Sequence, residues 1–64
     1  IMKWFLVFMF ISQAGSQQMV SIQSWETEQE CVDRMALEKE QAAAVLAGTP
    51  MKAEAWRCEL RNED

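Results

Sequence analysis

An unbroken run of eight apolar residues, Trp4–Ile11, constrains the fold of this chain more than any other feature of its sequence. The run is rich in aromatic and β-branched residues and leads into a turn-forming stretch, residues 12–16, which is typical of a β-strand. A membrane-spanning helix needs about 20 apolar residues, so no transmembrane segment is expected here. A strand that is apolar on both faces belongs in the middle of a sheet. We therefore expect a central strand over about residues 3–11.

The same segment also has the features of a secretory signal peptide. Lys3 precedes the apolar run, and Ser12-Gln13-Ala14 resembles a cleavage site between small residues. In that interpretation residues 1–14 are removed, and the mature chain begins near Gly15 in the periplasm or outside the cell. If residues 1–14 are retained, the expected location is the cytoplasm.

Two further segments are predicted to be strands. Residues 19–25 alternate between apolar and polar side chains, and their short connection to the first strand predicts a hairpin. Residues 54–60 are expected to place Trp56, Cys58 and Leu60 on one face and Ala55, Arg57 and Glu59 on the other. The last four residues, 61–64, read as a polar tail.

A helix is predicted over about residues 28–47. Thr27 and Glu30 have the spacing of a capping box, and Gly48 follows the last helical residue, where helices commonly end. Winding the segment at 3.6 residues per turn gathers one apolar face, made of Cys31, Val32, Met35, Ala36, Ala42, Ala43 and Leu46, with Lys39 inside the same arc.

These elements predict a single small α+β domain over residues 1–64, with a two-layer ββαβ fold. The hairpin makes the first two strands antiparallel, and a right-handed crossover through the helix places the third strand beside the first. The predicted three-stranded sheet has the order 2-1-3, with the helix packed on one face. This order puts the fully apolar strand in the middle.

The two cysteines are expected to form a disulfide. Cys31 lies about 24 Å from Ala47 along the helix, and Cys58 lies about 23 Å from Met51 along the last strand. The two thiols therefore lie level at one end of the fold. The alternative is a pair of reduced, buried thiols, as a cytoplasmic location favours. Because the chain has no histidine and two thiols do not complete a tetrahedral zinc site, no metal site and no cofactor are predicted.

The most informative feature for function is that one helix covers only one face of the sheet. The first strand would then leave a row of large apolar side chains on the open face, which monomers rarely expose to water. We expect a protein interface there, most simply a homodimer in which two sheets pack face to face. The candidate interface residues are Trp4, Phe5, Leu6, Val7, Phe8, Met9, Phe10 and Ile11. The alternative is that the turn over residues 12–18 or the C-terminal tail covers this face.

The sequence contains none of the patterns that mark an enzyme. It has no histidine for a catalytic triad and no glycine-rich phosphate loop, so no catalytic residues are predicted. The net charge of −4 argues against binding to nucleic acid. Three non-enzymatic roles remain. The chain can be a small structural or interaction protein that self-associates or docks to a larger assembly, as bacterial or phage accessory proteins do. It can be an acidic inhibitor of a basic partner, or a secreted protein stabilised by its disulfide.

Overall fold

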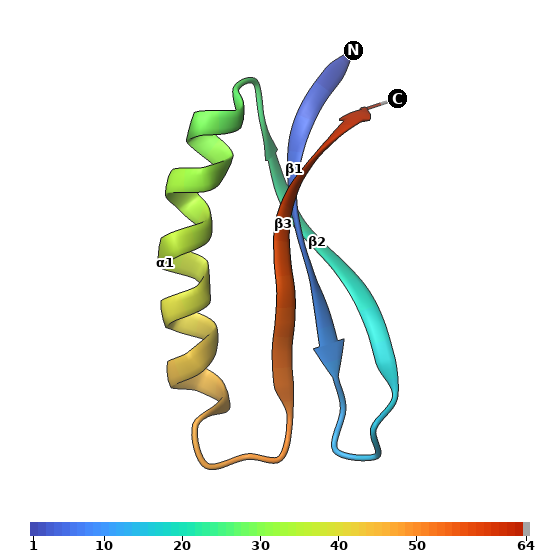
Figure 1. Cartoon of the computed structure of the whole chain (residues 1–64), viewed down its shortest axis with the longest axis vertical. Coiled ribbons are helices and arrows are strands. Elements are labelled where there is room, and N and C mark those ends of the chain that lie inside the picture. The colour runs from blue at the N-terminus through green and yellow to red at the C-terminus, as the bar shows by residue number, and fades with distance from the viewer. Residues whose placement is uncertain (64) are drawn as a thin grey trace.

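The computed structural model describes residues 1–63 and consists of a three-stranded sheet with one helix (Figure 1). The elements are β1 (Met2–Ile11), β2 (Gln17–Trp25), α1 (Glu28–Leu46) and β3 (Lys52–Asn62). Both edge strands are longer than the sequence pattern predicts. The predicted polar tail begins inside β3, and its last residue, Asp64, lies outside the described residues.

The strand order is β2-β1-β3, and β1 pairs antiparallel with both neighbours. The α+β fold and the predicted order 2-1-3 are thereby confirmed. β1 pairs with both other strands and therefore lies in the middle of the sheet, which explains its long apolar run. The two ends of the described chain lie side by side (Figure 1), with Met2 opposite Asn62 in the ladder and the Glu63 amide donating to the Ile1 carbonyl at 2.7 Å.

The helix begins where the sequence predicts it. The Thr27 hydroxyl accepts from the Glu30 amide at 3.2 Å, and the Glu30 carboxylate accepts from the Thr27 amide at 3.2 Å, which completes the capping box. At the other end the helix stops at Leu46, and Gly48 adopts a φ of 77°, a conformation that glycine takes without steric cost.

The buried face of α1 is rotated from the predicted one toward β2. Glu38 is half-buried on the sheet side, where its carboxylate pairs with Arg34 at 3.3 Å, and Lys39 is exposed beside β3. Val32, predicted to be in the core, is 40% exposed. The residues that α1 turns toward the sheet are Cys31, Met35, Glu38, Ala42 and Leu46. A salt bridge along the helix therefore lets a carboxylate occupy a half-buried position that the apolar periodicity does not identify.

Strand pairing settles which row of β1 faces the helix. Leu6 lies opposite Cys58, which is bonded to Cys31 of α1, so Leu6 and its row are on the helix side. Phe8 stacks on Trp56 with ring centroids 4.3 Å apart. The helix-side row is Trp4, Leu6, Phe8 and Phe10, and the open-face row is Phe5, Val7, Met9 and Ile11.

β3 contains a β-bulge, and because of it two side chains of β3 that are three positions apart both face the helix. The register shifts where Val7 pairs with Arg57 and Met9 with Glu54, so β3 contains one extra residue. Ala55 in this bulge has a φ of 56°, which is unusual for a residue other than glycine. The indole Nε1 of Trp56 donates to the Ala53 carbonyl at 3.2 Å across it.

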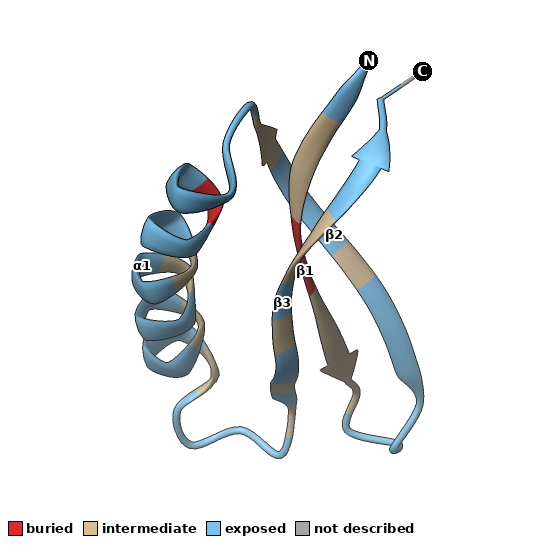
Figure 2. Cartoon of the chain, turned by 45° about the horizontal axis from the view of Figure 1, so that its top comes forward, coloured by how far each residue is buried: buried red, intermediate tan, exposed pale blue. Residues whose placement is uncertain are grey.

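The core is small. Leu6, Val7 and Cys31 are the fully buried side chains among the described residues, and Figure 2 shows the buried positions in the middle of β1 and near the start of α1. The radius of gyration is 12.5 Å, whereas a compact domain of this length has about 11 Å. The molecule is therefore an elongated two-layer slab, 38 × 21 × 14 Å, with much of its apolar surface near solvent.

Candidate protein-contact surface

The two cysteines lie together, as the sequence predicts. Cys31 in the first turns of α1 and Cys58 in β3 are joined in a disulfide, with their Cα atoms 6.2 Å apart. Cys31 is fully buried. The bond fixes the N-terminal part of the helix to β3, so the helix is anchored on one side of the sheet and at one end.

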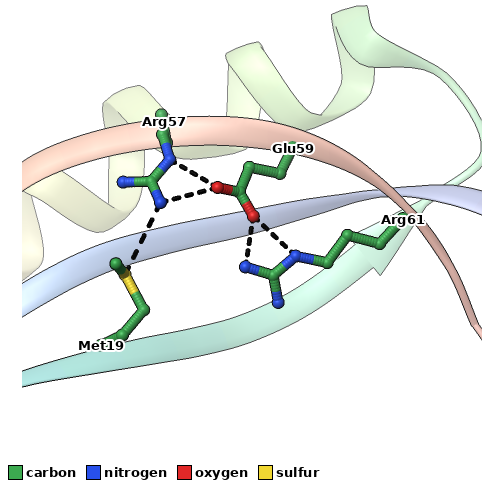
Figure 3. A network of polar contacts seen from close by, with 4 residues as sticks. All are labelled: Met19, Arg57, Glu59 and Arg61. Atoms are coloured by element: carbon green, nitrogen blue, oxygen red, sulfur yellow. Dashed lines mark hydrogen bonds and ion pairs between the residues drawn. The ribbon is translucent and has the colours of Figure 1, made fainter.

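Charged side chains from β3 cover the apolar centre of the open face (Figure 3). The Glu59 carboxylate accepts from Arg57 Nε at 2.7 Å and from Arg61 Nε at 2.6 Å. Arg57 also reaches across β1, and its Nη2 lies 3.9 Å from the Met19 sulfur on β2. Beneath this side chain, Val7 is fully buried.

A second polar bridge crosses the same face near the chain ends. Glu63 contacts Lys3 of β1 through an ion pair at 3.4 Å and accepts from the Ser24 hydroxyl of β2 at 3.4 Å. Long charged side chains readily lay their apolar stems over neighbouring apolar groups. The open face is therefore less exposed than the sequence pattern predicts, and residues 3–11 are all buried or half-buried. Arg61 and Glu63 of the predicted C-terminal tail take part in this cover, whereas Arg57 and Glu59 belong to the strand β3 itself.

The central carboxylate of this network is electrostatically stabilised. The hydrogen bond from Arg57, followed by that from Arg61, holds the pKa of Glu59 below its ordinary value, although desolvation acts in the opposite direction. Glu59 therefore carries its negative charge throughout the physiological pH range. Its two arginine partners are held in place across the open face.

The two edges of the sheet have opposite character. The edge strand β3 carries five charged residues: Lys52, Glu54, Arg57, Glu59 and Arg61. The edge strand β2 carries none along its whole length, Gln17–Trp25. Natural sheets usually protect their edge strands with charged side chains, which discourage pairing with another chain. The β2 edge lacks this protection.

An apolar groove lies beside the unprotected edge, between β2 and α1. It encloses about 370 Å³ and is called the β2 groove below. Its walls are Phe8, Phe10, Val20, Ile22, Glu38, Gln41, Ala42, Val45, Leu46, Ala53 and Trp56. Val45 is 77% exposed and Ile22 39% exposed. A second groove of about 440 Å³ lies between α1 and β3, and the charged residues Lys39, Lys52 and Glu54 contribute to its walls.

The structure distributes the eight candidate interface residues over three environments. Leu6 and Val7 are fully buried, Phe8 and Phe10 line the β2 groove, and the others are half-buried on one face or the other. Sequence reasoning missed Val20, Ile22 and Val45 as a continuous apolar surface. The absence of charge between Gln17 and Trp25 is the signal that identifies it.

Comparison with known proteins finds no matching family, no matching curated protein and no matching solved structure. Within residues 1–63, no three histidine, cysteine or acidic side chains are grouped in a way that would hold a metal ion. Among residues 1–63, no helix is both long and apolar enough to cross a membrane.

Proposed function

We propose that this chain is a non-enzymatic interaction protein that works by self-association through its β2 side. The β2 side comprises the outer edge of β2 and the adjoining β2 groove. The observation that carries the proposal is the coincidence of an uncharged edge strand with an apolar groove along the same border of the molecule. Unprotected edges and continuous apolar patches are both typical of surfaces that bind another protein.

The exposed apolar side chains on this side supply a driving force for association. Complete burial of a Val or Ile side chain contributes about 1.5–3 kcal/mol. Val45 and Ile22 still expose 77% and 39% of their surface in the isolated chain. A contact that covers them therefore gains free energy that folding alone leaves unused.

The open face, where the sequence pattern predicts the interface, is a less favourable contact surface. Packing a second sheet on it would take the Arg57, Glu59 and Arg61 side chains out of water. Removing charged groups from water commonly costs more than their mutual attraction returns. The apolar row beneath them is already largely covered.

Sedimentation equilibrium over a wide range of concentrations tests this proposal. We expect the apparent mass to rise from 7.4 kDa toward twice that value as the concentration increases. A mass that stays at 7.4 kDa up to the solubility limit would overturn the proposal of self-association.

A second candidate function, inhibition of a basic partner, is favoured by the uneven distribution of charge. Residues 26–47 contain six acidic and two basic side chains, so this segment alone accounts for the net charge of −4. Such a surface attracts a basic partner, and the attraction weakens with salt. Binding of polylysine, measured by calorimetry at low and high salt, tests it, with the E40Q and D33N variants expected to bind more weakly.

A further inference from the structure

We infer that the partner on the β2 side is a second copy of this chain, paired antiparallel through its own β2 edge. The product is one continuous six-stranded sheet built from two three-stranded sheets. This inference rests on the proposed self-association and specifies its geometry. It assigns the contact to backbone pairing at an edge and excludes packing between open faces.

The backbone of β2 is suited to accept another strand. Residues 17–21 pair with residues 7–11 of β1 in an unbroken antiparallel register, and the β-bulge is confined to the stretch between Ser21 and Ser24. A regular strand at the edge of a sheet presents unpaired N–H and C=O groups along its outer side. The regular stretch, residues 17–21, extends about 17 Å, and the whole of β2 with its bulge extends about 30 Å.

A second copy of β2 can pair with this edge, because antiparallel pairing of two identical strands is two-fold symmetric. Each residue on one copy faces a residue on the other, and the reverse contact is identical, as in an isologous dimer. A two-fold axis perpendicular to the sheet also puts both α1 helices on the same side. The two β2 grooves then adjoin, so Val20, Ile22 and Val45 of each copy are covered together.

Charge favours the β2 edge over every other border of the molecule for contact between identical chains. Two β3 edges would bring rows of charged residues together, and two helix layers would bring the acidic segment 26–47 against itself. Two β2 strands bring no charge of their own together, because residues 17–25 contain none, and Glu38 in the wall of each groove is paired with Arg34. The residual repulsion between two chains of net charge −4 is then long-range and screened by salt.

The available area is of the order that a specific dimer needs. An edge about 30 Å long and about 20 Å deep across the sheet and helix layers offers about 600 Å². Specific interfaces bury about 600–1,000 Å² per partner. The β2 side therefore lies at the lower end of that range, which fits a concentration-dependent dimer.

The first test compares the same substitution on the two edges. Ile22→Lys places a charge on the helix-side face of β2, whereas Leu60→Lys places it on the helix-side face of β3. The two residues are similarly accessible, at 39% and 49% exposed. We expect I22K to raise the dimer dissociation constant by about tenfold or more, because a charge would be buried in the contact. We expect L60K to leave it unchanged, and circular dichroism verifies the fold of both variants.

The second test uses the unmodified chain, so it does not depend on how the variants fold. Amide hydrogen exchange is measured residue by residue at low and high protein concentration. We expect the outward-facing amides of residues 17–25 to exchange at least about tenfold more slowly at high concentration, because pairing protects them. The amides of residues 52–62 are expected to exchange at the same rate at both concentrations.

Ionic strength provides the third measurement. Because the paired strands carry no charge while the two chains, each of net charge −4, repel one another, added salt is expected to strengthen the dimer. A dimer that forms with unchanged exchange in β2, or that L60K weakens as much as I22K does, would overturn the edge-pairing geometry while leaving self-association in place. A chain that remains monomeric at every concentration overturns both.

Discussion

The two edge strands belong to one sheet and pair with the same central strand, yet they differ in charge and in cover. β3 is bonded to α1 through Cys58, and its charged side chains extend over the open face as far as β2. β2 is uncharged and borders a groove that α1 only partly fills. The difference shows that the two edges have separate roles in this molecule. β3 contributes to the stability of the fold, whereas β2 is left available for contact with another chain.

The largest expected effect comes from removing the strand that both edges share. A chain that begins at Gly15 lacks β1, so neither β2 nor β3 retains a pairing partner. It also loses Leu6 and Val7, two of the three fully buried side chains. We expect this fragment to be unfolded, with circular dichroism and NMR spectra typical of a disordered chain. A folded fragment would show that the two edges are stable independently of β1.

Loss of the disulfide is the next largest effect and falls on the β3 side. The bond closes a loop of 27 residues, and in the chain-entropy treatment it contributes about 3.5 kcal/mol. We expect the double variant C31A/C58A, or the chain with its disulfide reduced, to lose about this free energy of unfolding in urea titrations. Equal stability with and without reductant would contradict the assignment of the anchor to this bond.

A smaller change in the opposite direction is expected at the bulge in β3. Ala55 has a φ of 56°, and left-handed backbone costs a non-glycine residue about 1–2 kcal/mol. A55G removes that cost, while greater freedom in the unfolded chain offsets part of the gain. We expect a net stabilisation of up to about 1 kcal/mol in thermal unfolding, and destabilisation by the β-branched variant A55V. If A55G is less stable than the parent, the strain is not located at this residue.

The smallest expected effect is the loss of stability from the charge network in acid. The pKa of Glu59 is lowered by its hydrogen bonds with Arg57 and Arg61, so its ionised form is favoured in the folded state. A carboxylate of this kind contributes stability above its unfolded pKa of about 4.3, and that contribution disappears as the pH falls through its lower folded value. The stability difference between E59Q and the parent should therefore be present at neutral pH and vanish in strong acid. A stability difference between the two chains that persists unchanged down to about pH 2 would contradict this expectation.

The topology was predictable because the responsible signals are local or follow from chain geometry. The apolar run at β1 and the alternation at β2 indicate strands, and the Thr27 capping box fixes the start of the helix. With those elements in place, short connections and a right-handed crossover leave few arrangements. The meeting of Cys31 with Cys58 follows from the rise per residue in a helix and in a strand.

The details that define the contact surface could not be predicted in the same way. Both rows of β1 are apolar, so periodicity does not indicate which row the helix covers. The cover over Val7 depends on the direction that Arg57 takes across the sheet, which no spacing in the sequence specifies. The sequence does not indicate the bulge at Ala55 either, since alanine carries no preference for a positive φ. The lack of charge in β2 was visible and its edge position was predicted, but the apolar groove beside it depends on where α1 packs, which the sequence does not specify.

The adjacency of the first and last described residues has a consequence for how this domain combines with others. Because Met2 is paired with Asn62 at the end of the sheet, a polypeptide enters and leaves the fold at one point. Domains of this kind tolerate insertion into a loop of a host protein, and circular permutation, without rearrangement of their strands. A short linker across that point would give a permuted chain whose new ends are opened in the turn at residues 12–16, with the same sheet order as the parent.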